Sequence, residues 1–349
     1  MDLSFLFYLS SGLFLGWSVG ASEASNFGSA VATKMIKFRT AAVIASVCVI
    51  IGAVYAGAGT SQTLGKLGGI NTLPGAFMAA FSAALAAYWM VKLAIPVSTS
   101  QAIVGAIIGW NFFSGRPTDI STLSQIVSAW ILGPVLAGII AILLYGILKF
   151  LFKKWPIHLL RKDCYTRVAL ILAGAFGSYA LGANNIANVM GVFVDSSPLQ
   201  KLELPFGLTL NSAQVLFLLG GIAIAVGITT YSKKVIYTVG NTIMKLSPLM
   251  AWVVVAAQGL VLFIFSSKGL QEFLLNLGLP ALPLVPVSST QAVIGAVVGL
   301  GVAKGGHVLN WPVLGKVGIS CIITPVFAAL ICYISLFFLQ NVFGQVVYK

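Results

Sequence analysis

The sequence predicts an all-helical protein that crosses a membrane several times and is built from two related halves. Hydrophobic residues make up 59% of its 349 residues and charged residues only 8%, whereas charged residues make up about 25% of a soluble domain. The apolar residues form long unbroken runs, unlike the strands of a transmembrane barrel, in which polar and apolar residues alternate. A motif of fourteen residues also occurs twice, which indicates an internal duplication.

The repeated motif spans residues 96–109 (PVSTSQAIVGAIIG) and 286–299 (PVSSTQAVIGAVVG). Each copy starts with proline and hydroxyl residues, whose side-chain oxygens can cap the free N–H groups at the start of a helix. Each copy ends in Gly-x-x-x-Gly, a spacing that lets two membrane helices pack backbone to backbone. Two ordinary apolar helices with polar caps would share these features, but an echo of this length is rare by accident. We therefore expect one helix to begin in each copy.

The first half contains four long apolar runs besides the helix that begins at the motif. We expect membrane spans at residues 3–20, 40–57, 74–94 and 121–148. A polar patch, GASEASNFG, follows the first run at residues 20–28. The Gly- and Thr-rich stretch 57–73 and the stretch 111–120 are typical of loops, because Gly, Pro, Asn and Asp interrupt their apolar residues.

The densest charge in the chain lies at residues 149–167 and marks the boundary between the halves. It comprises Lys149, Lys153, Lys154, Arg161, Lys162, Asp163 and Arg167, together with His158. Basic residues in a short loop between spans are typical of the cytoplasmic side of a membrane; an amphipathic helix on anionic lipid would have the same composition. We expect a first membrane repeat at 1–148, a basic cytoplasmic loop at 149–167 and a second membrane repeat at 168–349.

The second half repeats the order of elements in the first. Its expected spans are the apolar runs at about 168–181, 210–230, 248–267 and 312–340. The first of these leads into residues 182–191 (GANNIANVMG), which match the polar patch 20–28, and the second copy of the motif precedes the last run. The chain therefore has about ten apolar segments. If each repeat crosses the membrane an odd number of times, the two copies are inverted.

Four polar patches inside these apolar halves are candidates for a transport site. The two hydroxyl-rich helix starts suit an anion, because free N–H groups, the helix dipole and rotatable hydroxyls all favour negative charge. The clusters at 20–28 and 182–191 offer amide and carboxylate oxygens, which suit a small cation such as Na⁺. Broken helices that meet near the midplane build such sites in many secondary transporters.

The same polar patches could have a purely structural role. Glu23 is an ionisable group that follows an apolar run, which makes it a functional candidate at membrane depth, but at the interface it would merely be solvated. The asparagines of the second cluster could instead join helices to one another. The candidate oxyanion-binding residues are Ser98, Thr99, Ser100, Ser288, Ser289, Thr290, Asn26 and Asn188. The candidate Na⁺ ligands are Glu23, Ser22, Asn184, Asn185, Gln101 and Gln291.

Other function classes find no support in the sequence. It has no nucleotide-binding loop of the Walker type and no His/Asp/Ser constellation, so ATP-driven transport and enzymatic catalysis are not expected. The four cysteines have neither paired nor metal-like spacing. The net charge of +13 would suggest nucleic acid in a soluble protein, but the basic residues here lie mostly between apolar runs. We expect no nucleic-acid partner and no cofactor beyond a coupling Na⁺.

At its four motifs the chain resembles the inorganic phosphate transporter (PiT) family of secondary anion permeases. That family carries a G-A-N-D-x-A-N-like signature and, later, a P-V-S-T-T-H/Q motif in each half. Here the second signature is Gly182-Ala-Asn-Asn-Ile-Ala-Asn188, and the later motifs are those quoted above. The resemblance covers nearly the whole chain. It implies inverted repeats, broken or re-entrant helices around a central oxyanion site, coupling to a cation, and a homodimer.

The chain departs from the family pattern in both signatures. The first is Gly20-Ala-Ser-Glu-Ala-Ser-Asn26, so Ser22 and Glu23 replace the family's Asn-Asp pair, and in the second signature Asn185 replaces the aspartate. Two carboxylates have therefore become one. If a family carboxylate accepts the proton of hydrogen phosphate, its loss relaxes the penalty against sulfate, which has no proton to donate.

These observations predict a secondary active transporter of inorganic phosphate in the cytoplasmic membrane, coupled to Na⁺ or H⁺. A permease for sulfate or a related tetrahedral oxyanion is the first alternative. An uncoupled anion channel is the alternative from another class, and accumulation of substrate against a gradient would separate it from a transporter.

Overall fold

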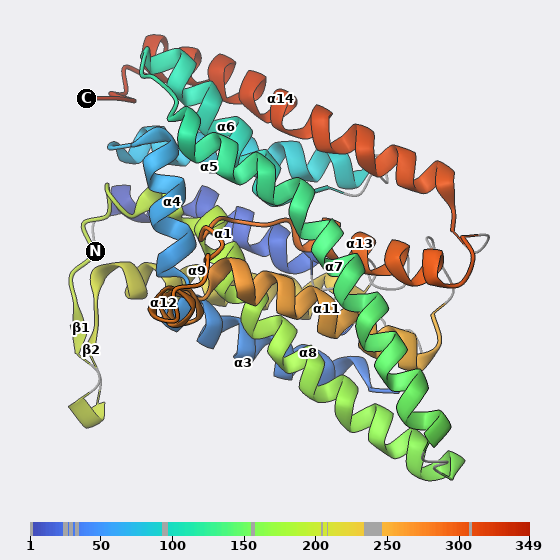
Figure 1. The fold of residues 1–349 in the computed structure, drawn as a ribbon. Helices are drawn as coiled ribbons and strands as arrows, with labels where there is room; N and C mark the ends of the chain where they lie inside the picture. Colours follow the sequence, from blue (N-terminus) through green and yellow to red (C-terminus); the bar gives the residue numbers. More distant parts are fainter. Residues whose placement is uncertain are drawn as a thin grey trace.

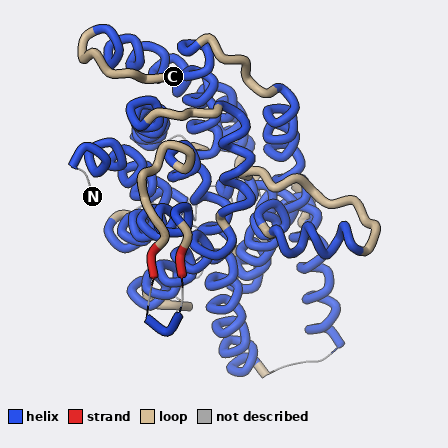
Figure 2. The backbone as a smooth tube through the Cα atoms, turned by 90° about the vertical axis from the view of Figure 1, so that its left-hand side faces the viewer, coloured by secondary structure: helices blue, strands red, loops and turns tan. Residues whose placement is uncertain are grey.

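The computed structural model describes residues 3–23, 27, 31, 35–92, 97–154, 158–203, 205–207, 209–233, 246–306 and 309–349. The helices of the first half are α1 (Leu3–Glu23), α3 (Phe38–Ala56), α4 (Ala58–Gly68), α5 (Leu73–Lys92), α6 (Thr99–Ser114) and α7 (Ile120–Lys154). Those of the second half are α8 (Leu159–Met190), α9 (Ser212–Thr230), α11 (Pro248–Ser266), α12 (Lys268–Asn276), α13 (Ser289–Ala303) and α14 (Trp311–Asn341) (Figure 1). Among the described residues, the only strands are the two-residue pair β1 (Leu202–Glu203) and β2 (Thr209–Leu210) (Figure 2).

Eight helices in the described part of the chain are long and apolar enough to cross a membrane. They are α1, α3, α5, α7, α8, α9, α11 and α14. The expected spans therefore formed as helices, with bounds that differ from the expected ones mainly where a run continues into polar residues. The two motif helices are shorter: α6 has 16 residues and α13 has 15, about 24 Å at 1.5 Å per residue. This length is less than a hydrocarbon layer of about 30 Å.

Each motif helix is the second arm of a hairpin, and the first hairpin is α5–α6. Thr72, beside the start of α5, and Trp110, near the end of α6, both donate hydrogen bonds to the backbone oxygen of Val347, at 2.7 and 3.1 Å. Tyr8 at the start of α1 donates to Gln345 at 2.8 Å. The first hairpin therefore opens at the end of the molecule where the C-terminal residues lie.

The second hairpin, α11–α13 with the short α12 between its arms, opens at the opposite end. Lys304, which follows α13, lies 3.1 Å from the sulfur of Met250 at the start of α11, and its ammonium also lies over the ring of Tyr145 on α7. From Ile120 to Tyr145, α7 rises about 38 Å, more than the hydrocarbon thickness. Because α7 begins beside the first hairpin's opening, the two hairpins enter from opposite ends, as inverted repeats require.

The two repeats are packed into each other through the glycines of the repeated motif. A Cβ atom at Gly105 would overlap the backbone of Pro325 on α14, and one at Gly295 would overlap the backbone of Pro134 on α7. Each motif helix thus lies against the last helix of the other repeat, which confirms the backbone-to-backbone packing expected from Gly-x-x-x-Gly. In Figure 1, α14 follows the top edge of the molecule from right to left, and α7 crosses it diagonally from upper left to lower right, in the opposite direction.

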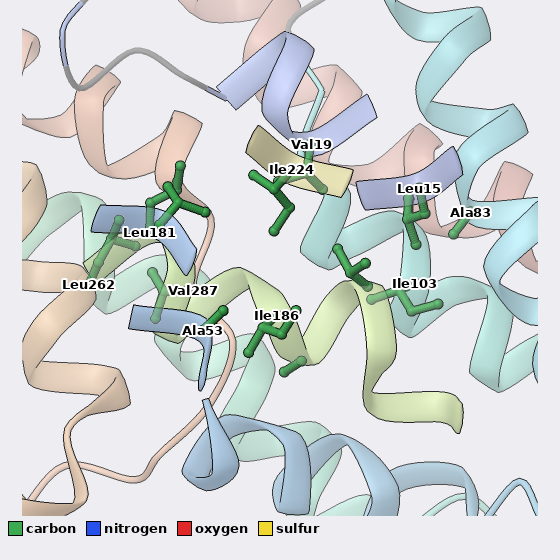
Figure 3. Close-up of a cluster of buried hydrophobic side chains, with 14 of the residues drawn as sticks. Leu15, Val19, Ala53, Ala83, Ile103, Leu181, Ile186, Ile224, Leu262 and Val287 are labelled. Atoms are coloured by element: carbon green, nitrogen blue, oxygen red, sulfur yellow. The ribbon is translucent and has the colours of Figure 1, made fainter. Parts of the chain in front are cut away.

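The hydrophobic core is continuous across the two repeats and uses many small residues. Figure 3 shows part of it, where Val19 of α1, Ile224 of α9, Leu181 of α8 and Leu262 of α11 belong to one buried cluster. Alanines and glycines at the crossings let the helices approach closely, so that dispersion contacts hold the bundle together where lipid offers no hydrophobic driving force.

Two stretches expected to be loops contain helical residues. The stretch 57–73 contains α4, whose Leu64 and Leu67 are buried and which is capped by Gly69, a glycine with a left-handed φ of 53°. Tertiary burial of these leucines outweighs the turn-forming composition. In the basic stretch 149–167, α7 continues to Lys154 and α8 begins at Leu159. With 35 residues, α7 is about 52 Å long and carries its basic end beyond a hydrocarbon layer of about 30 Å.

Candidate functional site

The candidate site is centred on Glu23, the last residue of α1. Its side chain is 2% exposed, and among the described residues it is the one charged side chain that is buried. One carboxylate oxygen accepts hydrogen bonds from the backbone N–H of Thr99, at 3.2 Å, and from the Thr99 hydroxyl. The other accepts from the Ser289 hydroxyl and from the amide of Asn185, at 2.9 Å. The carboxylate therefore joins α1, α8 and the starts of both motif helices.

Both motif helices begin at this point because a serine caps each of them. Ser98 has extended backbone angles and accepts from the N–H of Gln101 at 3.4 Å; Ser288 accepts from the N–H of Gln291 at 3.2 Å. The predicted helix starts are therefore confirmed, with one serine in each copy acting as the cap. We call residues 97–100 and 287–290 the tips of the first and second hairpin.

The two tips contact each other through equivalent residues. The Ser100 hydroxyl donates to the backbone oxygen of Val287, and the Thr290 hydroxyl donates to the backbone oxygen of Val97, each at 3.3 Å. Ser100 and Thr290 hold the same position in the two copies of the motif, as Val97 and Val287 do. The exchange of identical bonds places a pseudo-twofold axis between the tips.

Glu23 and Asn185 also hold equivalent positions, one in each signature, and they bond to each other on this axis. The signature pair and the two tips therefore form one buried polar cluster. Its parts come from four separate stretches of the chain, and both repeats contribute equally.

Asn184 clamps the second tip from α8. Its amide donates to the oxygen of Val287 at 2.7 Å, and its own oxygen accepts from the Val287 N–H at 3.0 Å. Because a backbone N–H can only donate and a carbonyl can only accept, this pair also fixes which way the amide points. Its equivalent in the first repeat behaves differently, since the Ser22 hydroxyl donates to Ser18 within α1 at 2.7 Å. The geometry suits Asn184 to a positioning role.

Three amide oxygens on the motif helices and the second signature are buried and accept no hydrogen bond from the part of the chain that the structure describes. They belong to Gln101, Asn188 and Gln291. The Asn188 amide nitrogen is occupied, since it donates to the Ser100 hydroxyl at 2.9 Å and to the Asn185 oxygen at 3.0 Å. A buried acceptor without a donor costs about 1–3 kcal/mol. A buried oxygen that accepts no hydrogen bond is suited to binding a cation, and it repels an oxyanion.

The structure gathers most of the residues predicted for the site. Thr99, Ser289, Asn185 and Glu23 meet directly, and Ser100, Asn184 and Asn188 join them through Val287 and Asn185. Ser22 is bonded within its own helix, and Asn26 lies outside the described residues.

The sequence did not point to the backbone groups of Val97 and Val287 that take part in the site, because every residue type carries a backbone carbonyl. Sequence reasoning also missed Thr60 of α4, whose hydroxyl donates to the oxygen of Ala183 at 3.1 Å. The cluster of hydroxyls at Thr60, Ser61 and Thr63 was the available signal.

Comparisons with known proteins agree with this architecture. The family described as "Phosphate transporter family" matches residues 19–271 and 281–348. A "Putative phosphate permease" of Methanocaldococcus jannaschii is 28% identical over 335 residues, which cover 96% of this chain and 95% of the relative. A protein of the same name from Thermococcus kodakarensis is 25% identical over 95% of this chain and 96% of its own length. A solved structure described as "The sodium-dependent phosphate transporter" has the same fold, with a TM-score of 0.71 at 22% identity, over 95% of this chain and 99% of its own.

Proposed function

Because this chain belongs to the phosphate transporter family of multi-pass membrane proteins, we propose that it carries inorganic phosphate across the cell membrane by secondary active transport, coupled to Na⁺. One observation carries the proposal: two hairpins that enter from opposite ends meet tip to tip at a buried carboxylate. A site reached from both ends through equivalent elements is what alternating access requires.

The two tips supply the chemistry for an oxyanion. Each tip is a helix N-terminus, where the dipole is equivalent to about half a positive charge. The hydroxyls of Thr99 and Ser289 already bind a carboxylate, which is itself an oxyanion. Hydrogen bonds to a charged group are worth about 1.5–3 kcal/mol each, so a few such donors are enough to orient a tetrahedral dianion.

A coupling cation is supported by the charge balance of the cluster. Glu23 repels a bound dianion, and a buried charge needs compensation. The buried amide oxygens of Gln101, Asn188 and Gln291 are suitable ligands. The solved neighbour is described as sodium-dependent, which favours Na⁺ over H⁺ for this chain.

Sulfate is the second candidate substrate, and a specific observation favours it. Asn185 donates its amide to Glu23 where the family signature has a second carboxylate. The site therefore carries one negative charge fewer, which lowers the electrostatic cost of a dianion that has no proton to donate.

The test is uptake of labelled phosphate and labelled sulfate by purified protein in liposomes, with and without an inward Na⁺ gradient. Concentrative phosphate uptake that stops when the Na⁺ gradient is dissipated supports the proposal. Preferential concentration of sulfate selects the second candidate. Flux that only equilibrates the anion, at any cation gradient, would identify a channel.

We propose a homodimer, as the family resemblance implies, and two membrane repeats at 1–148 and 168–349 joined by a cytoplasmic segment at 149–167. Cross-linking in native membranes and mass measurement of the purified protein test the dimer.

A further inference from the structure

We infer that Glu23 couples the cation to the oxyanion by competition. Its carboxylate holds the hydroxyl donors that the oxyanion needs, so the oxyanion gains them only when a cation or a proton takes over the carboxylate. This inference rests on the proposed transport function and adds the physical origin of the coupling.

The Glu23 carboxylate and the oxyanion need the same hydrogen-bond donors. Each hydroxyl has a single hydrogen to donate. The hydroxyls of Thr99 and Ser289, one from each tip, both give theirs to Glu23, and the Thr99 N–H does the same. An oxyanion bound between the tips would accept from these same groups. It therefore cannot occupy them while the carboxylate does.

The Glu23 carboxylate also spans the pseudo-twofold axis. One of its oxygens binds the first tip and the other binds the second tip and Asn185. In this position Glu23 is an oxyanion built into the protein at two helix N-termini, the location that a free anion would select. Two anions at one such location repel each other, so substrate binding displaces the carboxylate.

Once displaced, the Glu23 carboxylate binds a cation. At 2% exposure it cannot rely on bulk water, and a buried charge that gives up its donors needs a compensating charge. The acceptor oxygens of Gln101, Gln291 and Asn188 lie on residues two or three positions from Thr99, Ser289 and Asn185, which all bind Glu23. They supply further oxygen ligands for a Na⁺ that joins the carboxylate.

Competition of this kind means that bound Na⁺ strengthens anion binding and that the bound anion strengthens Na⁺ binding. By linkage, the factor by which Na⁺ strengthens anion binding equals the factor by which the anion strengthens Na⁺ binding. Phosphate and sulfate should share this dependence, because the displaced group belongs to the protein. If hydrogen phosphate instead donated its proton to a stationary Glu23, sulfate alone would depend on Na⁺.

The test measures equilibrium binding of labelled phosphate and sulfate to the purified, lipid-reconstituted protein, with Na⁺ exchanged for choline at constant ionic strength and at pH 6 and pH 8. We expect the affinity of the wild type for both anions to rise about tenfold or more with Na⁺. In Glu23→Gln, whose neutral amide needs no cation, we expect less than about a twofold change. Glu203→Gln removes an exposed carboxylate that pairs with Lys201 and should behave like the wild type.

Ser289→Ala provides a second measurement should Glu23→Gln not fold. It removes one bond from the carboxylate, so displacement costs less and the Na⁺ dependence should flatten. If Ser289 only donated to the oxyanion, affinity would fall by the same factor at every Na⁺ concentration, and the inference would fail.

Two further outcomes separate the inference from the proposed function. If the wild type binds phosphate with the same affinity at all Na⁺ concentrations and both pH values, or if Glu23→Gln keeps the wild-type dependence, competition is refuted while anion binding stands. If neither anion binds under any condition, the proposed function itself is refuted.

Discussion

The Asn185→Asp variant is the sharpest test of the charge balance in the central cluster. It restores the second carboxylate of the family signature at the position that now donates an amide hydrogen to Glu23. The atoms concerned, the amide nitrogen of Asn185 and a carboxylate oxygen of Glu23, lie 2.9 Å apart. The substitution adds a negative charge there and converts a hydrogen bond into a repulsive contact.

The size of this repulsion follows from Coulomb's law. At 2.9 Å and an effective dielectric constant of about 20, two unit charges repel by about 6 kcal/mol. A cation between the carboxylates, or a shared proton, removes this cost. Because about 1.4 kcal/mol corresponds to a tenfold change in binding, realising even a quarter of the repulsion would raise the Na⁺ dependence of transport about tenfold.

The same repulsion should change the substrate preference. Hydrogen phosphate can donate its proton to one of the two carboxylates, and sulfate cannot, so we expect the phosphate-to-sulfate uptake ratio to rise about tenfold. The assay is competitive uptake of the two labelled anions into liposomes, across a Na⁺ series and a pH series. Asn276→Asp makes the same chemical change at the exposed end of α12 and serves as the control.

A result in which Asn185→Asp leaves both the anion ratio and the Na⁺ dependence within about twofold of wild type would refute this reasoning. The contact between Glu23 and Asn185 would then be a structural bond between α1 and α8, and the hydroxyl tips alone would carry substrate selection.

Three further predictions address packing, capping and orientation. Gly295→Ala places a Cβ atom on a backbone carbonyl of α7 and should destabilise the protein by about 1–3 kcal/mol, measured by thermal unfolding in detergent. Gly146→Ala, whose new Cβ atom would meet no other atom, is the control and should leave the stability unchanged. Equal stability of the two variants would contradict the packing described above. Ser288→Ala removes the cap of α13, so it should lower the stability of the protein by about 1 kcal/mol and weaken phosphate binding. Ser288→Thr keeps a capping hydroxyl and should bind phosphate as the wild type does. Identical phosphate binding by the wild type and both variants would show that the cap does not contribute to the site. A cysteine at Lys154, in a protein without Cys164, should resist an impermeant thiol reagent applied to right-side-out cells, and labelling from outside would reverse the proposed orientation.

Much of the fold is visible in the sequence because membrane insertion is a local property of each segment. The transfer free energy of an apolar run depends on its own residues, so helices such as α9 and α14 begin and end within a few residues of their expected bounds. The caps are local as well, since Ser98 and Ser288 bond to N–H groups three residues away. Local composition failed at α4, where burial of Leu64 and Leu67 in the assembled bundle stabilises a helix over a turn-rich stretch.

By itself, then, the sequence determined the helical membrane class, the duplication, the helix starts at the two motifs and the family. Only the tertiary structure decided how the polar groups pair. Ser22 and Asn184 are equivalent in the two signatures, yet one hydroxyl bonds within α1 and the other side chain reaches across to Val287. Glu23 meets Thr99, Asn185 and Ser289, which are far from it along the chain. Such pairs depend on how closely the glycines of each hairpin let it pack against the opposite repeat, and no local sequence pattern gives that distance.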